Sequence, residues 1–195
     1  MKFSLSEINE VIRSRRSIYP KQFSSRKVHA EQIQVMIENA RWAPSHRLTE
    51  PWRFVVFQDD AKNDLGAFHA ALYEKESGES FNPLKKEKIL MNASKSSAII
   101  AVVLKRDEIK RVPRKEEYAA VSCAVQNLHL TATAFGIGGY WGTGAMTYHP
   151  EMRTYLGFEE QDEVVGFFYL GYPEIEWPRK QVRKQVREIT EWRDK

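Results

Sequence analysis

The chain has a single cysteine and no long apolar run, and each of these scarcities excludes a class of protein. Cys123 is the only cysteine in 195 residues, which rules out an internal disulfide and a thiolate cluster for zinc or iron–sulfur. It lies in an apolar segment, so we expect it in the core. The longest apolar run, Ala98–Leu104, is too short to cross a bilayer, and no apolar stretch typical of a signal peptide begins the chain. We therefore expect a cytoplasmic protein with no membrane partner.

Charge of one sign is only slightly in excess. The net charge is +4, and basic residues are concentrated only in residues 179–187, where five of nine are lysine or arginine. Such a run suits an anionic ligand or a solvated helix face. Because no aromatic residues alternate with basic ones and no helix-turn-helix pattern is present, we expect no nucleic-acid partner.

Several catalytic patterns are also missing. Gly136 and Gly138 begin a dinucleotide-binding fingerprint, but Trp141 stands where its third glycine belongs, and the segment follows a helix instead of opening one. Ser122 has neither a nucleophile elbow nor a histidine partner, which excludes serine hydrolase chemistry. We expect no metal site, because four of the histidines lack metal-ligand spacing: His29, His69, His129 and His149.

The hydrophobic pattern predicts one α+β domain over residues 1–195, in which a central sheet is covered by helices. Helical spacing after a cap at Ser6 predicts a first helix that ends near Arg15. The polar stretch 74–83 is expected to be a mobile insertion. Segment 118–135 is apolar nearly all round, which predicts a buried central helix that stops at Gly136. Further helices are expected at 30–40, 59–73, 84–93 and from Pro150, and strands at 54–57, 98–104, 137–141 and 164–170.

Four short blocks carry the functional signal. Arg15, Arg16 and Ser17 follow the first helix; residues 42–46 (Trp-Ala-Pro-Ser-His) lead to Pro51 and Trp52; residues 138–144 read Gly-Gly-Tyr-Trp-Gly-Thr-Gly; and Arg183 lies in the late basic run. Arginines can hold an anion, and glycines let a flat ligand approach the backbone closely. Each block also has an ordinary explanation, as a solvated helix end, a packed tryptophan, a loop histidine or a structural turn.

In this order, the four blocks resemble the nitroreductase family of FMN-dependent oxidoreductases over nearly the whole chain. The resemblance implies a three-layer sandwich with a mixed or antiparallel central sheet. It also implies a homodimer with composite flavin sites and NAD(P)H as the co-substrate. Arg15, Arg16, Ser17 and Arg183 would then hold the flavin phosphate and polar edge, and Trp141, Gly142 and Thr143 would line the ring. Trp42 and His46 would come from the partner chain.

The chemistry would take place on FMN, so no side chain is predicted to be catalytic, and the backbone N–H near Thr143 would face N5. The expected reaction is reduction of a nitroaromatic, a quinone or a similar small electron-poor acceptor by a ping-pong mechanism. Two alternatives stay open: a flavin-storing or regulatory protein without turnover, and a related flavin reaction such as dehalogenation or dehydrogenation. Tyr19 stands where some members of the family have a lysine near the flavin. Lys85, Lys86 and Lys88 lie near a region that contacts the ribityl chain in some members, and none of them is assigned to that contact.

Overall fold

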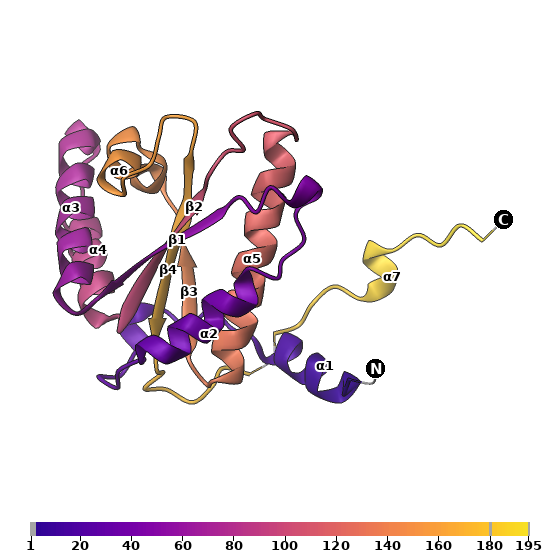
Figure 1. The fold of residues 1–195 in the computed structure, drawn as a ribbon. Helices are drawn as coiled ribbons and strands as arrows, with labels where there is room; N and C mark the ends of the chain where they lie inside the picture. The colour runs from indigo at the N-terminus through magenta and orange to yellow at the C-terminus, as the bar shows by residue number, and fades with distance from the viewer. Residues whose placement is uncertain (1–2, 180, 195) are drawn as a thin grey trace.

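The computed structural model describes residues 3–179 and 181–194. Its centre is a sheet of four strands in the order β1-β2-β4-β3, in which every neighbouring pair is antiparallel (Figure 1). The strands are β1 (Trp52–Gln58), β2 (Ala98–Leu104), β3 (Gly138–Gly142) and β4 (Glu163–Gly171). β2 is buried along its whole length, because helices cover both faces of the sheet, as its unbroken apolar sequence predicts.

One face of the sheet is covered by α2 (Ala30–Ala40) and α5 (Arg114–Ala134). Alternate residues of β2 point to this face, where they join a core cluster with Phe168 of β4 and the inner faces of the two helices. The buried apolar positions of α5 recur at helical spacing and are Ala120, Val121, Ala124, Val125, Leu128 and Ala132. A single apolar side of α5 therefore packs against the sheet.

The opposite face is covered by α3 (Asp59–Ser77) and α4 (Pro83–Lys95), with the short α6 (Pro150–Tyr155) beside them (Figure 1). Here the other residues of β2 pack with Phe167 and Tyr169 of β4 in a second core cluster. Gly66 allows α3 and α4 to approach closely, since a Cβ at this position would lie 2.4 Å from the Cβ of Ala93. The helix–sheet–helix layers confirm the predicted α+β sandwich, and the sheet is of the antiparallel kind.

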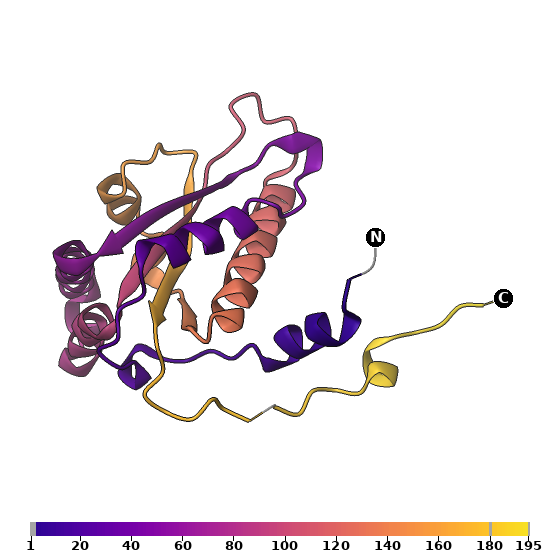
Figure 2. The ribbon, with the colours of Figure 1, turned by 60° about the horizontal axis from the view of Figure 1, so that its bottom comes forward.

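The two ends of the chain extend away from these layers. α1 (Leu5–Ser14) and a C-terminal segment with the short α7 (Val186–Ile189) project from the same side of the molecule (Figures 1 and 2). Both expose large apolar side chains, including Phe3 at 75% of its surface and Trp192 at 83%. These segments have little to pack against within one chain.

Three local expectations are wrong. α1 begins after Ser4, whose hydroxyl accepts from the backbone N–H of Glu7, two residues before the expected cap at Ser6. α3 continues through Ser77, so the helix takes up part of the expected polar insertion. Cys123 is exposed, because it lies on the side of α5 that faces away from the sheet. Among the described helices, none combines the length and apolar character needed to cross a membrane.

Candidate functional site

Among the described residues, four arginines from the two ends of the chain line one cavity: Arg13, Arg15, Arg16 and Arg183. Arg15 is the C-terminal cap of α1, and it lines a space of about 390 Å³ with Arg16 and Arg183. Burial lowers the pKa of Arg15, and the charges of Arg183 and Arg16 lower it further. Cations that repel one another around a cavity are stabilised by an anion, above all by one with several oxygens. Arg15, Arg16 and Arg183 are called the arginine cluster below.

Arg16 also binds backbone carbonyls at the end of α1 and in the C-terminal segment. Its side chain is buried, and its guanidinium donates to three backbone carbonyls: those of Arg13 at 2.8 Å, Arg15 at 2.7 Å and Arg179 at 3.0 Å. Nearby, the indole Nε1 of Trp177 donates to the carbonyl of Ser14 at 2.7 Å. These bonds attach the C-terminal segment to the end of α1, so Arg16 places the backbone that carries Arg183.

Ser17 connects the arginine cluster to the sheet. It forms an isolated parallel bridge with Gly139 of β3, and the N–H of Ile18 donates to the carbonyl of Gly139 at 3.1 Å. His129 of α5 lies under the same corner. Its Nε2 is 3.0 Å from the carbonyl oxygen of Arg16, and its Nδ1 is 3.5 Å from Nη1 of Arg15. Backbone contacts therefore link the arginine cluster to β3, which ends at Gly142, one residue before Thr143.

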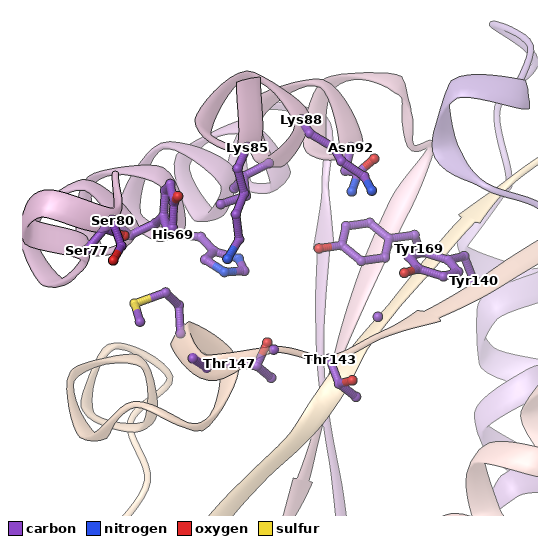
Figure 3. Close-up of a pocket in the computed structure, with 16 residues that line it drawn as sticks. His69, Ser77, Ser80, Lys85, Lys88, Asn92, Tyr140, Thr143, Thr147 and Tyr169 are labelled. Carbon is purple, nitrogen blue, oxygen red and sulfur yellow. The ribbon is translucent and has the colours of Figure 1, made fainter. Parts of the chain in front are cut away.

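A second cavity, of about 410 Å³, opens beside Gly142 and Thr143 (Figure 3). Its other walls come from α3, α4 and β4, and we call it the turn cavity. Among its lining residues are Lys85, Lys88, Asn92, Tyr140 and Tyr169. An adjoining space of about 450 Å³ shares Lys88, Asn92 and Tyr140 with it and adds Tyr19, Lys21 and Met91. Aromatic rings, two lysines and a turn with two glycines thus surround a region suited to a planar molecule.

Tyr140 and Trp141 lie on opposite faces of the sheet, because successive residues of a strand alternate. Tyr140 points to the α4 side and lines the turn cavity, whereas Trp141 packs into the core cluster with α5. Gly166 of the neighbouring β4 leaves space for that indole, since a Cβ there would lie 2.1 Å from Nε1 of Trp141. The side chain of Trp141 therefore does not line the turn cavity. Tyr140 lines it instead, where the resemblance implied Trp141.

His46 lies far from the arginine cluster of its own chain. His46 is in a short 3-10 helix, His46–Leu48, and its Nδ1 is hydrogen-bonded to the carboxylate of Glu116 near the start of α5. Glu116 and His129 are about 20 Å apart at 1.5 Å per helical residue. Trp42 is 74% exposed. Three residues of this loop have positive φ, Arg47, Leu48 and Glu50, and strain of this kind often accompanies a functional contact.

Comparisons with known proteins identify the family of this chain. The model of the nitroreductase family matches residues 12–172. The chain belongs to the nitroreductase family. YfhC of Bacillus subtilis, which carries the name of an NAD(P)H nitroreductase, is 33% identical over 184 residues, or 94% of this chain and 92% of YfhC. YdjA of Escherichia coli K12, similarly named, is 34% identical over 74% of this chain and 78% of its own length. The resemblance inferred from the sequence is confirmed.

Solved nitroreductase-like structures share the fold. A nitroreductase-like family protein from Bacillus cereus superposes with a TM-score of 0.81 at 24% identity, covering 100% of both chains. The FMN-dependent nitroreductase NfnB of Mycobacterium smegmatis, solved with NADPH, has a TM-score of 0.76 at 16% identity over 97% of this chain and 100% of its own. At these identities the structures establish the nitroreductase architecture, and this chain's ligands have to be argued from its own residues.

Within this nitroreductase fold, the structure brings Arg15, Arg16 and Arg183 together and joins them through Ser17 to Gly142 and Thr143. Sequence reasoning missed His129, Tyr140 and Asn92. The pattern held a signal for Tyr140 alone, because its alternation with Gly142 places both on one face of β3. His129 and Asn92 depend on how α5 and α4 are rotated against the sheet, which one sequence does not reveal.

Proposed function

We propose that this nitroreductase-family chain is an FMN-dependent oxidoreductase that passes electrons from NAD(P)H to a small electron-poor acceptor such as a nitroaromatic or a quinone. The observation that carries the proposal is that Ser17, next to the arginine cluster, is bridged to Gly139 of β3, the strand that leads to the turn cavity at Gly142 and Thr143. An anion site and a planar, aromatic-walled site joined in this way suit a phosphorylated flavin. The names of YfhC and YdjA support the same activity.

The residues present fit FMN. Arg15 and Arg183 are placed to bind the phosphate, and the lowered pKa of Arg15 reflects clustered positive charge that a phosphate would offset. Lys88 lines both the turn cavity and the adjoining space, so we assign it to the polar edge of the flavin, where it would supply positive charge. A Cβ at Gly144 would meet no atom within 4 Å, which leaves the backbone of the turn open to a flat ring.

FMN, when bound, supplies the hydride transfer. The chain would supply position and charge: the N–H of Thr143 would donate toward the flavin edge, Lys88 would provide positive charge, and Tyr140 and Tyr169 would shield one side from water. Burial raises the pKa of both tyrosines, so their hydroxyls stay protonated and can donate hydrogen bonds. NAD(P)H and the acceptor use the turn cavity in succession. For a nitroaromatic the net reaction is ArNO₂ + NADH + H⁺ → ArNO + NAD⁺ + H₂O.

The active form in this proposal is a homodimer with composite sites. Within one chain, His46 is too far from Arg15 to share a ligand with it, so we assign His46 and the neighbouring Trp42 to the site of the partner chain. Exposed apolar residues support an interface: Trp42 and Leu48 in this loop, and Val182 and Trp192 in the C-terminal segment. Aromatic anchors of this kind are enriched where chains meet. Cytoplasmic location stays a prediction.

The test measures the affinity of the flavin-free protein for FMN and for riboflavin, which lacks the phosphate. We expect Arg183→Ala to weaken FMN binding about ten- to a hundred-fold, because it removes a charge-assisted hydrogen bond, and to leave riboflavin binding unchanged. Arg187→Ala, an exposed arginine of α7, is the control. Equal affinities of wild type and Arg183→Ala for FMN would remove Arg183 from the site. Anaerobic addition of NADH or NADPH then separates functions: bleaching of the bound flavin indicates the enzyme, and resistance to both indicates a flavin-storing protein.

A further inference from the structure

One end of the turn cavity holds a group of residues that the proposed flavin contacts do not use. Lys85 and His69 lie together at this end, near Ser77 and Ser80, while Tyr140 and Asn92 lie at the other end (Figure 3). Lys88, Asn92 and Tyr140 line both the turn cavity and the adjoining space. Lys85 and His69 line the turn cavity and not the adjoining space. Lys85 and His69 are therefore separated from the edge at which Lys88 is assigned to the flavin.

The charge in this cavity is of one sign. Of the residues that the structure describes, two lysines line it and no aspartate or glutamate does. Within the described residues, no carboxylate lies within 4.0 Å of Nζ of Lys85, and this ammonium lies 4.6 Å from the ring centre of Tyr73. Nearby lysines differ: Lys86 pairs with Glu74 and Lys75 with Glu151. A cation directed into a cavity without a counter-ion is complementary to an anionic ligand.

His69 adds a neutral hydrogen-bonding group beside this charge. Burial lowers its pKa to about 4, and the positive charge of Lys85 contributes to the shift. At neutral pH the imidazole is therefore uncharged, and it can donate one hydrogen bond while Lys85 supplies the charge. The remaining walls are Tyr73, Tyr140, Tyr169, Ile89 and Met146, which suit a planar and largely apolar body.

We propose that Lys85 and His69 bind the acidic group of the electron acceptor, so that this protein prefers aromatic acceptors carrying a carboxylate or sulfonate over their neutral analogues. The proposal rests on the proposed function for the place of the reducible group, beside Gly142 and Thr143. An aromatic acceptor bound in this way has its acidic group toward Lys85 and His69 and its reducible group toward Gly142 and Thr143. Lys85 is a specificity-determining residue here, and it takes no part in the transfer of electrons.

The first experiment compares 4-nitrobenzoate with its methyl ester as acceptors for the FMN-loaded protein and NADH. Wild type is expected to show a higher kcat/KM for the acid. Lys85→Met should lower the ratio of kcat/KM for acid to ester about ten- to a hundred-fold, the usual effect of losing one charge-assisted contact. Lys86→Met, one residue along α4 and directed to Glu74, should keep the wild-type ratio. Equal kcat/KM values for acid and ester in wild type would overturn the proposal and leave the proposed function intact.

The second experiment needs no turnover. Benzoate is added to the flavin-free protein, and the imidazole of His69 is followed by NMR during a pH titration. The account predicts that benzoate raises the pKa of His69, because the anion offsets the charge of Lys85, and that methyl benzoate does not. Benzoate that binds wild type and Lys85→Met equally would contradict the proposal. So would a Lys85→Met variant with weakened FMN affinity, since Lys85 would then belong to the flavin. Failure of the protein to bind FMN at all would instead refute the proposed function.

Discussion

Arg15 donates a hydrogen bond to Nδ1 of His129, and the backbone fixes the direction of this bond. The Nε2 of His129 lies 3.0 Å from the carbonyl oxygen of Arg16. A carbonyl can only accept, so Nε2 carries the proton and Nδ1 offers its lone pair to Nη1 of Arg15 at 3.5 Å. Burial and the charge of Arg15 lower the pKa of His129 to about 4, which keeps it in this neutral form. His129 thereby orients the Arg15 guanidinium within the arginine cluster.

Replacement of His129 should therefore affect phosphate binding more than ring binding. We expect His129→Leu to weaken FMN binding by roughly three- to ten-fold, about one neutral hydrogen bond, while riboflavin binds as to wild type. His129→Gln, which can donate to the carbonyl of Arg16, should recover part of the loss. A loss of equal size for both flavins would instead indicate a general effect on the fold. Titration by flavin fluorescence gives both dissociation constants.

The two buried histidines should make the stability of the protein dependent on pH. His69 and His129 each have a folded pKa of about 4, below the ordinary value near 6.5, so the unfolded chain binds more protons between these values. The free energy of unfolding is thus expected to fall as pH drops from about 6.5 to 4, by up to about 3 kcal/mol for each histidine. Urea unfolding of wild type and of His69→Gln/His129→Gln checks this. Parallel stability curves over this range would contradict it.

Arg16 is predicted to act through geometry as well as charge. Its guanidinium reaches the carbonyls of Arg13, Arg15 and Arg179, and the single ammonium of a lysine cannot span all three. Arg16→Lys should therefore destabilise the protein by about 2 kcal/mol and speed proteolytic cleavage of the C-terminal segment. Arg41→Lys, an exposed arginine paired with Glu38, is the matched control. Cleavage of Arg16→Lys at the wild-type rate would show that these bonds do not hold the segment.

Gly144 and Gly142 should respond differently to a side chain. A Cβ at Gly144 meets nothing within 4 Å, whereas one at Gly142 lies 3.0 Å from Tyr169 and 3.2 Å from Tyr140. We expect Gly144→Val to keep the melting temperature of the flavin-free protein and to weaken FMN binding at least ten-fold, because the new side chain occupies the ligand's space. Gly142→Val should lower both, and Thr143→Ala should change neither greatly. Unimpaired FMN binding by Gly144→Val would place the flavin away from this turn.

Much of the fold follows from the sequence because its signals are local. The apolar period of 30–40 and the unbroken run of β2 give elements that match the structure residue for residue. The ends of helices are harder to predict where two sequence signals compete. Ser4 and Ser6 are both good caps, and the polar sequence after Tyr73 contains strong helix formers that prolong α3 up to Gly78. Cys123 was misplaced because small apolar residues all round α5 hide which side faces the sheet.

In the candidate site, too, some residues could be predicted from local sequence and others could not. Arg15, Arg16, Ser17 and Arg183 could be named from their blocks, and the structure brings them together. The face of the sheet on which Trp141 lies depends on strand register, and the lining of one cavity by Lys88, Asn92 and Tyr140 depends on the rotation of α4. Both involve contacts between distant segments. Arg16 shows a further difference, since its side chain bonds to backbone in the structure. A motif gives the residue type and leaves its partners undetermined.

The measurement that tests the central claim most directly uses a mixed dimer. One chain carries Arg15→Ala and Arg183→Ala, the other Trp42→Ala and His46→Ala, and the two are co-expressed with different tags and purified through both. If each flavin site takes the arginine cluster from one chain and the Trp42 loop from its partner, each homodimer has two defective sites. The mixed dimer then has one site without any substitution. The account predicts that it binds one FMN per pair of chains with wild-type affinity. A mixed dimer that binds FMN no better than either homodimer would contradict the composite site.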